Sequence, residues 1–324
     1  RGLSGQTYKG AIFWDTEMFM LDFYLAVLPE VAQTVLRYRI DTLPGAREKA
    51  RHYGLRGAFY AWESQEGGYD ACSDYNVTDV FTGRPMRTYF RDKQVHISAA
   101  VVYGLCRYAD CTGDDSLWLT GGADVLIECA RFYHSLLVRR VECGECELWD
   151  VIGPDEYHER VNNSAYTNEM ARFVFGKAAE LAAWLKERHS EAYAALEDQL
   201  HFASELAGFR EAAQTLKEQK PRADGVIPQF DGYLSLEDAS VDTVRGRLMN
   251  DREYWGGAYG VASGTQVIKQ ADVITLLCML PDRYAPPVLR ASYAYYLPRT
   301  EHGSSLSACM YALAACALGL PDEA

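Results

Sequence analysis

The part of the chain richest in reactive groups is a turn within residues 150–173, DVIGPDEYHERVNNSAYTNEMARF. A Gly-Pro pair predicts the turn itself, and four titratable side chains follow within five positions: Asp155, Glu156, His158 and Glu159. A carboxyl group surrounded by tyrosines and amides can have its pKa raised by burial or by a neighbouring anion, and can then serve as a general acid. The spacing alone does not rank the carboxyls. A solvated acidic loop is one alternative, and a simple helix cap made by Asp155 is another.

Two pairs of a tryptophan and an acid have the chemistry of a sugar-binding platform. Trp14 and Asp15 occur in GAIFWDTEMFM, and Trp62 and Glu63 occur in FYAWESQEGG. An indole ring can stack on the C–H face of a sugar while a carboxylate accepts hydrogen bonds from its hydroxyls. The first pair could also be a core tryptophan beside a helix cap made by Asp15 or Thr16. Two such pairs in one chain favour a polyol ligand.

Two further polar clusters lie just before apolar helices. Lys269 and Gln270 stand at the start of one helix, in VIKQADV, where a lone lysine is often only solvated. The stretch TEHGSSLSACMYALAA places His302, Ser304 and Ser305 ahead of another helix. Serine hydroxyls and free backbone N–H groups at a helix N-terminus can bind an anion. An ordinary serine cap would explain one of the serines but not the whole cluster.

The composition limits the class of partner. The chain has 324 residues, 48% of them hydrophobic, and a formal net charge of -13. This acidic balance argues against nucleic acid or an anionic membrane as the partner, whereas a neutral ligand fits and a small anion needs a local cradle of donors. The longest apolar run, near residues 310–320, is well short of the roughly 20 residues of a membrane-spanning helix. We therefore expect no membrane partner.

The cysteine usage favours a reducing, cytoplasmic location. The nine cysteines are an odd number, and most lie in apolar helical patterns where cysteine behaves as a small hydrophobic residue. Cys143 and Cys146 have the spacing of a zinc-binding pair, but no second pair follows. A structural zinc needs four ligands. We therefore expect no metal site.

Apolar residues recur at helical spacing along most of the chain. The pattern predicts helices at residues 30–40, 43–54, 95–108, 113–140, 165–185, 192–206, 209–217, 270–280, 287–296 and 306–318. Connectors rich in Trp, Tyr, Gly and acids lie at residues 58–91, 143–164 and 224–269. Long loops in compact domains are usually functional or disordered, and these are too aromatic for disorder. The alternation predicts an all-α toroid whose loops gather at one mouth.

With these residues assembled, the chain resembles glycoside hydrolase family 65, the family of maltose, trehalose and kojibiose phosphorylases. Seven stretches carry the resemblance in the family's order: GAIFWDTEMFML, YRIDTLPGAREKARHYGLRGAFYAWES, QVHISAA, DVIGPDEYHERVNNSAYTN, DGVIPQFDGY, KQADV and HGSSLS. The resemblance implies an (α/α)6 barrel, incomplete at its C-terminal end. It also implies that residues 1–324 are a catalytic-domain fragment that lacks an N-terminal β-sandwich and C-terminal segments, and that the intact protein is a homodimer.

The resemblance further implies inverting phosphorolysis of an α-glucosidic disaccharide to β-glucose 1-phosphate, with inorganic phosphate as co-substrate and no cofactor. Glu156 would be the general acid, with Asp155 and Glu159 as tuners or caps and His158 as a hydrogen-bonding wall. The remaining roles are binding of the glucosyl unit by Trp14, Asp15, Trp62, Glu63, Lys269 and Gln270, and binding of phosphate by Ser304 and Ser305.

Two departures from the family pattern leave alternatives open. Ala11 stands where relatives commonly have histidine, and Glu301 lies beside the serine pair where a phosphorylase is expected to lack an acid. An inverting hydrolase needs an acid and a base with room for water, roughly 6.5–9.5 Å apart. Glu301 could be that base with Glu156 as the acid. A third possibility, from another class, is a sugar-binding module without catalytic activity.

Overall fold

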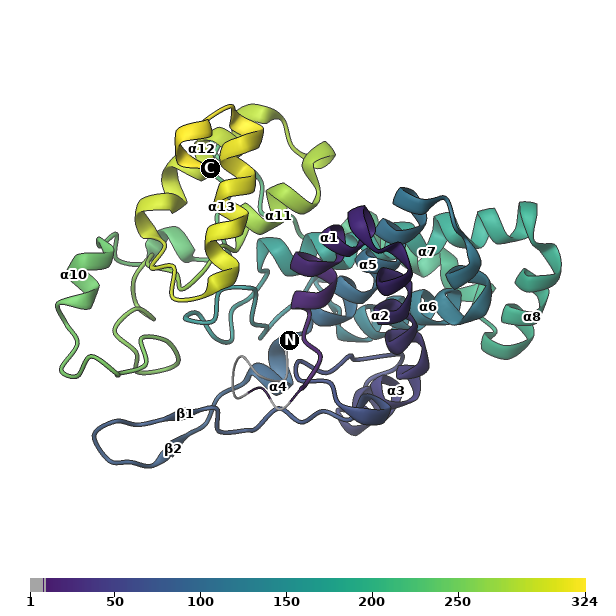
Figure 1. Cartoon of the computed structure of the whole chain (residues 1–324), viewed down its shortest axis with the longest axis horizontal. Helices are drawn as coiled ribbons and strands as arrows, with labels where there is room; N and C mark the ends of the chain where they lie inside the picture. Colours follow the sequence, from purple (N-terminus) through teal and green to yellow (C-terminus); the bar gives the residue numbers. More distant parts are fainter. Residues whose placement is uncertain (1–7, 9) are drawn as a thin grey trace. The chain divides into compact units, whose positions relative to one another are not determined.

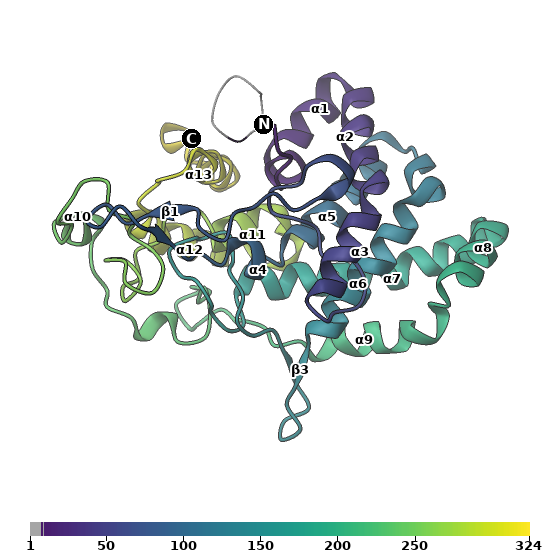
Figure 2. The ribbon, with the colours of Figure 1, turned by 90° about the horizontal axis from the view of Figure 1, so that it is seen from below.

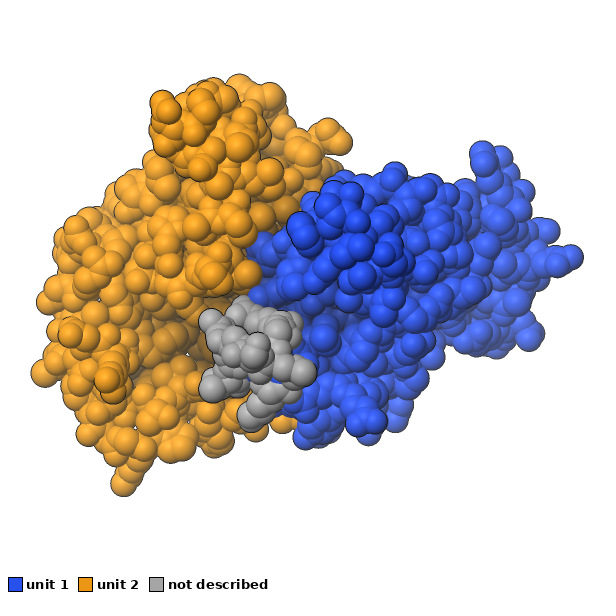
Figure 3. All heavy atoms as spheres, in the orientation of Figure 1, with its two compact units in different colours: residues 1–72, 95–146, 170–216 blue, residues 73–94, 147–169, 217–324 orange. Residues whose placement is uncertain are grey.

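The computed structural model describes residue 8 and residues 10–324, and the chain forms two compact units (Figure 3). Unit 1 comprises residues 1–72, 95–146 and 170–216, and unit 2 comprises residues 73–94, 147–169 and 217–324. None of the helices in the described part of the chain is long and apolar enough to cross a membrane.

Unit 1 is helical, and its core is built around helix α5, Ile97–Thr112. The sequence of α5 is apolar on nearly all sides, which is typical of a buried helix; it packs against α1, α2 and α6 (Figure 1). Gly113 ends α5 with a left-handed φ of 67°, a conformation that glycine adopts without strain. The other elements of this unit are η1 Thr16–Met20, α1 Leu21–Val27, α2 Pro29–Asp41, α3 Leu43–His52, η2 Glu66–Gly68, η3 Trp118–Gly122, α6 Ala123–Leu136, β3 Val138–Arg139, α8 Ser190–Leu200, η4 Ala203–Glu205 and α9 Leu206–Thr215.

Two elements cross the boundary between the unit definitions. Helix α7, Ala165–Arg188, begins in unit 2 and continues through unit 1, and the two-residue strand β4, Cys146–Glu147, pairs with β3 in a hairpin (Figure 2). Cys146 lies at the base of this hairpin, where its Sγ accepts a hydrogen bond from the Thr215 hydroxyl at 3.4 Å. Among the described residues no group of three or more His, Cys, Asp or Glu side chains is arranged to hold a metal ion.

Unit 2 combines three packed helices with long connectors. Helices α11 Val273–Met279, α12 Pro286–Tyr296 and α13 Ser305–Leu318 contact one another (Figure 1). A second apolar cluster under the connectors includes Tyr157, Val244 and Trp255, and the two rings of Tyr157 and Trp255 stack at 5.9 Å. The remaining elements are β1 Val77–Thr78 paired antiparallel with β2 Pro85–Met86, α4 Phe90–Lys93, η5 Tyr233–Ser235, α10 Val241–Arg245, η6 Pro281–Arg283, η7 Leu297–Arg299 and η8 Pro321–Glu323.

The predicted all-α class is confirmed, and so are most of the predicted helices. Two boundaries are wrong. The helix predicted at residues 113–140 ends at Leu136, and the strand β3, Val138–Arg139, follows it. The helix predicted at residues 192–206 stops at Leu200 because His201 adopts a left-handed φ of 50°. All three predicted connectors are largely irregular backbone.

Candidate active site

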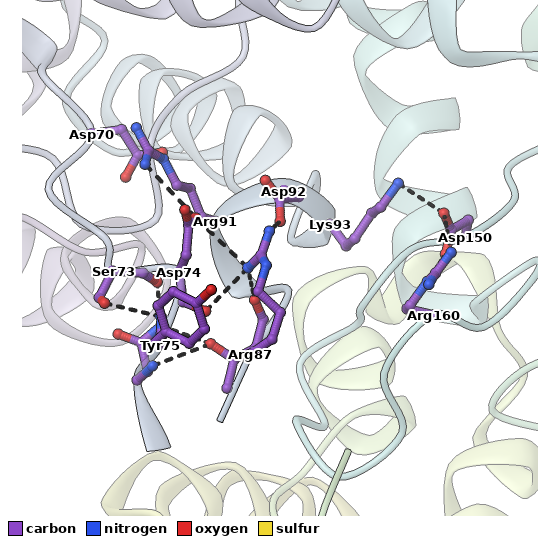
Figure 4. Close-up of polar contacts among 12 residues, drawn as sticks. Asp70, Ser73, Asp74, Tyr75, Arg87, Arg91, Asp92, Lys93, Asp150 and Arg160 are labelled. Carbon is purple, nitrogen blue, oxygen red and sulfur yellow. Dashed lines mark hydrogen bonds and ion pairs between the residues drawn. The ribbon is translucent and has the colours of Figure 1, made fainter. Parts of the chain in front are cut away.

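The loop that carries the crowded turn is closed at its base by backbone pairing. Val151 and Val161 exchange two N–H···O bonds of 2.9 Å, so residues 152–160 form a loop with its ends fixed. An ion-pair cluster reinforces this closure: the Asp150 carboxylate contacts Arg160 at 2.7 Å and Lys93 at 2.8 Å (Figure 4). These groups are all partly exposed, so each pair contributes little by itself.

Gly153 is required at the start of the turn because the backbone passes tightly against two polar side chains. A Cβ on Gly153 would lie 2.6 Å from Asp272 Oδ2 and 3.0 Å from Ser164 Oγ. Neither atom belongs to a flexible surface side chain, since both residues are buried. The Gly-Pro signal in the sequence therefore marks a close approach of backbone to side chain, and this approach places the next residues of the turn.

Glu156 and Lys269 form an ion pair within unit 2. The Lys269 ammonium contacts Glu156 Oε2, and the side chains are 23% and 12% exposed respectively, so a ligand could reach them. The Tyr254 hydroxyl donates to the backbone oxygen of Glu156 at 2.7 Å, which fixes the backbone behind the carboxyl group. The structure thus brings together the predicted acid and one predicted sugar-binding residue.

Glu159 is a carboxyl of the turn whose environment raises its pKa. Burial, and then the charge of Glu156, raise the pKa of Glu159 to about 7. Its Oε1 atom is buried and has no hydrogen-bond partner among the described residues. Glu159 also borders a cavity of about 770 Å³ in unit 2, whose lining includes Tyr157, His158 and Phe230.

The segment that leads into Ser304 and Ser305 is hydrogen-bonded directly to residues 268–270, the lysine segment. The N–H of Glu301 donates to Ile268 O at 2.8 Å, and the N–H of Gly303 donates to Lys269 O at 3.0 Å. The Tyr157 hydroxyl donates to Glu301 Oε2 at 3.3 Å, so the acid beside the serines also contacts the turn. Glu156, Lys269 and the segment that leads into Ser304 and Ser305 therefore belong to one connected cluster.

The two serines occupy different positions at the start of α13. Ser304 is the N-cap, and its Oγ accepts a hydrogen bond from the N–H of Leu306 at 3.3 Å. Ser305 is the first residue of the helix and is exposed. His302 shares a 2.9 Å hydrogen bond with Ser307 Oγ, and that oxygen also accepts from the N–H of Ala271 at 3.0 Å. The ordinary capping role thus applies to Ser304 alone.

The Trp-acid pairs lie together in unit 1. Ile12 and Ser64 exchange backbone hydrogen bonds of 2.8 and 3.0 Å, which brings the segments of both pairs side by side. The Trp62 ring packs edge-on against Phe13 at 5.2 Å, and Trp14 is buried against His96 at 4.6 Å. Asp15 stands at the N-cap position of η1, but its side chain makes no capping hydrogen bond, so the capping alternative for Asp15 is wrong.

The predicted residues thus fall into two groups, one in each unit. Unit 1 contains Trp14, Asp15, Trp62 and Glu63, and unit 2 contains Glu156, Lys269, Gln270, Ser304 and Ser305. Ala11, the position of the departure from the family pattern, is fully buried beside the first group. The side chain of Gln270 is already engaged, because its Nε2 donates to Pro154 O.

Three polar residues around the turn were not singled out from the sequence. Gln229 and Asp272 are hydrogen-bonded to Asp155 of the turn, and the Tyr254 hydroxyl donates to the backbone oxygen of Glu156. They lie 74, 117 and 98 positions away from their partners. Gln229 and Tyr254 lie in the connector at residues 224–269, whose length and aromatic content indicate a functional segment. For Asp272 the sequence offered only an ordinary acid at a helix start.

The comparisons with known proteins identify the family. The chain belongs to glycosyl hydrolase family 65, because the model of the family's central catalytic domain matches residues 1–324. A nigerose phosphorylase of Lachnoclostridium phytofermentans is 59% identical over 100% of this chain and 43% of its own length. A 1,2-alpha-glucosylglycerol phosphorylase of Bacillus selenitireducens is 41% identical over 100% of this chain and 42% of its own.

A solved structure shares the fold. A protein from the human microbiome, assigned as a kojibiose phosphorylase, has a TM-score of 0.86 to this chain at 26% identity, covering 99% of this chain and 45% of that one. The helical-barrel fold expected from the resemblance is therefore confirmed. The chain spans less than half the length of the relatives it matches.

Proposed function

We propose that the protein to which this chain belongs is an inverting phosphorylase of α-glucosidic disaccharides. Glu156 protonates the glycosidic oxygen as the bond from that oxygen to the anomeric carbon breaks. An oxygen of inorganic phosphate attacks the anomeric carbon from the opposite face, which gives β-glucose 1-phosphate and a free sugar. Phosphate is already a nucleophile, so a single carboxylic acid is sufficient.

The observation that carries this proposal is the connected cluster in unit 2. Glu156 is paired with Lys269, and the backbone of Lys269 is bonded to the segment that leads into Ser304 and Ser305. An acid therefore lies in the same hydrogen-bonded cluster as a helix N-terminus that can bind an anion. Lys269 has to leave Glu156 before the carboxyl can carry a proton, and a sugar hydroxyl is a suitable replacement partner for the lysine.

Binding of the glucosyl unit is assigned to Trp14, Asp15, Trp62, Glu63, Lys269 and Gln270, and binding of phosphate to Ser304 and Ser305. Family membership and the names of the relatives support this assignment. The relative at 59% identity is a nigerose phosphorylase, which makes nigerose the disaccharide to test first.

An inverting hydrolase is the second candidate, and one contact favours it. Glu301 Oε2 accepts a hydrogen bond from Tyr157, so a carboxylate is fixed beside the serine segment, where it would repel phosphate and could activate water. Burial and the charge of Glu301 raise the pKa of Tyr157, so this tyrosine stays a neutral donor to Glu301.

The deciding experiment is turnover by the full-length protein. Nigerose and other α-linked diglucosides are incubated with and without phosphate, and glucose 1-phosphate and glucose are measured. We expect turnover to depend on phosphate and to release one glucose 1-phosphate per bond broken. Turnover that ignores phosphate would establish the hydrolase instead.

The role of Glu156 is tested by Glu156→Gln, which keeps the size and polarity of the side chain but cannot donate an acidic proton. We expect kcat on the disaccharide to fall about 10²- to 10⁴-fold. Binding without turnover in the wild-type protein would favour the sugar-binding module.

A further inference from the structure

Asp155 is the most completely enclosed group of the turn. Its carboxylate is fully buried and accepts four hydrogen bonds. Oδ1 accepts from the backbone N–H groups of Lys269 at 2.9 Å and Tyr157 at 3.2 Å. Oδ2 binds His158 Nδ1 at 2.6 Å and accepts from Gln229 Nε2 at 3.0 Å. One carboxylate thus joins the two residues at positions 157 and 158 to the backbone of Lys269 and to the side chain of Gln229.

The backbone around Asp155 is held from the other direction as well. The N–H of Asp155 donates to Asp272 Oδ2 at 3.0 Å, and Gln270 Nε2 donates to Pro154 O. His158 Nε2 shares a 2.8 Å hydrogen bond with Thr265 O, so the histidine also connects the turn to the backbone a few residues before Lys269. The Pro154–Asp155 peptide group is therefore attached to Gln270 and Asp272 through both its oxygen and its N–H.

Burial and the neighbouring groups act on the charge of each titratable member of this network. Burial opposes ionisation of Asp155, but the charge of His158 and the hydrogen bonds from His158 and Gln229 lower the pKa of Asp155. Burial likewise opposes a charge on His158, but the Asp155 charge raises the pKa of His158. Burial raises the pKa of Asp272 to about 8, so Asp272 is mainly uncharged at neutral pH. A buried ion pair beside a neutral carboxyl is the result.

We propose that Asp155 is a positioning residue that sets the place of the Glu156 carboxyl relative to Lys269. This inference rests on the proposed function, because it assigns a role to Asp155 only if Glu156 is the acid. Asp155 is the residue next to Glu156 in the chain, and it bonds directly to the backbone of Lys269. Loss of its carboxylate frees the turn to move relative to the lysine segment, and a misplacement of about 1 Å can cost roughly 100-fold in rate.

The test compares two substrates of the full-length enzyme that differ in their need for an acid. A disaccharide has to have its leaving oxygen protonated, whereas α-glucosyl fluoride loses fluoride without full proton transfer. Phosphate attacks the anomeric carbon in both reactions, so both yield glucose 1-phosphate. A defect in placing the acid therefore lowers kcat on the disaccharide far more than kcat on the fluoride.

For Asp155→Ala we expect kcat on the disaccharide to fall about 100-fold and kcat on glucosyl fluoride by less than about 10-fold. Equal losses on the two substrates would overturn the inference, because they would indicate a general structural defect. KM for the disaccharide is expected to change little, since Asp155 is buried and does not reach the ligand.

Asp155→Asn supplies a second variant that keeps the fold. The amide oxygen can still accept from the N–H groups of Lys269 and Tyr157, and its NH2 group can donate to a neutral His158. Gln229 can turn its amide, because its Oε1 has no hydrogen-bond partner among the described residues. We expect kcat on the disaccharide within about 10-fold of wild type. A loss as large as that of Glu156→Gln would overturn the inference even if Asp155→Ala fails to fold.

The matched control is Glu169→Gln. Glu169 is also a buried carboxylate of unit 2, and it pairs with Arg283 at 2.6 Å. We expect Glu169→Gln to lower the melting temperature and to change the two kcat values by the same factor. A wild-type enzyme whose turnover ignores phosphate overturns the proposed function. A phosphate-dependent wild type whose Asp155→Ala variant behaves like Glu169→Gln overturns only the positioning role.

Discussion

At the scale of single residues, the crowded turn holds three acids with three different environments. Asp155 is fully buried and paired with a histidine, and Glu156 is partly exposed and paired with a lysine. Glu159 has one buried oxygen that finds no hydrogen-bond partner in the part of the chain that the structure describes. A group's environment decides whether it carries a charge, holds a position or donates a proton. The three acids lie within five positions of one another in the sequence. The partners that separate their roles lie far along the chain, at residues 229–272, and no local pattern connects them to the turn.

Asp272 gives a prediction about stability and pH. Burial raises its pKa from 3.8 to about 8 in the folded protein, so the proton is bound more tightly in the folded than in the unfolded chain. The stability that this proton contributes is fully present below about pH 4 and is lost progressively as the pH rises towards 8. Asp272→Asn removes this loss and keeps an oxygen that accepts from the N–H of Asp155.

We therefore expect Asp272→Asn to raise the free energy of unfolding by several kcal/mol, up to roughly 5, at pH 8 and to leave it nearly unchanged at pH 4. Urea unfolding at both pH values measures the difference. A variant that is less stable than wild type at pH 8 would show that Asp272 is ionised in the folded protein or that its geometry matters more than its charge.

At the scale of elements, the sequence predicts regular helices well and breaks in them poorly. The spacing of apolar residues predicts the ends of α5 and α13 to within a few residues of those observed, because the pattern of one buried face is a local property of the sequence. The break at His201 and the turn at Arg160 both need a left-handed φ in a residue other than glycine. Tertiary contacts impose such conformations, and no local pattern announces them.

The same distinction applies to the candidate site. Residue types pointed to the crowded turn, Lys269 and the serines, the family resemblance singled out Glu156, and the structure joins these residues in one cluster. The hydrogen bond between the Asp155 N–H and Asp272 could not be predicted from the sequence. It depends on which distant acid approaches the backbone at Gly153. The chemistry of the site is therefore visible in the sequence, whereas its supporting contacts are not.

The start of α13 gives a prediction that separates two roles of neighbouring serines. Ser304 caps the helix through Leu306, whereas the Ser305 side chain is exposed at the first helical position. We expect Ser304→Ala to cost about 0.5–2 kcal/mol of stability and also to raise KM for phosphate. Ser305→Ala is expected to raise KM for phosphate with a stability change below about 0.5 kcal/mol.

Urea unfolding and phosphate titrations of the full-length enzyme measure both effects. Ser235→Ala, in a short 3-10 turn of unit 2, is a matched control for removal of a serine hydroxyl. If Ser305→Ala left the KM for phosphate unchanged, the helix N-terminus would not be the phosphate site.

At the scale of the whole molecule, each unit relies on a buried polar network to place its share of the candidate residues. In unit 1 the Arg39 guanidinium bonds both carboxylate oxygens of Glu17, at 2.6 and 3.0 Å, and donates to Phe13 O at 3.1 Å. Both side chains of the ion pair are fully buried. The segment that carries Trp14 and Asp15 is thus anchored on each side by one arginine.

Breaking this pair on one side leaves an uncompensated buried charge. We expect Glu17→Gln to lower the free energy of unfolding by about 3–5 kcal/mol, because the remaining guanidinium keeps its charge while one of its partners becomes neutral. The double variant Glu17→Met with Arg39→Met removes both charges at similar volume, and we expect it to recover most of that loss. Urea unfolding of the double variant, together with Glu17→Met alone and Arg39→Met alone, closes a double-mutant cycle. A double variant as unstable as Glu17→Gln would mean that hydrogen bonds to Phe13, rather than charge compensation, hold the segment. In that case KM for the disaccharide should rise in the double variant, which lacks the Arg39 donor to Phe13 O, but not in Glu17→Gln, which keeps it.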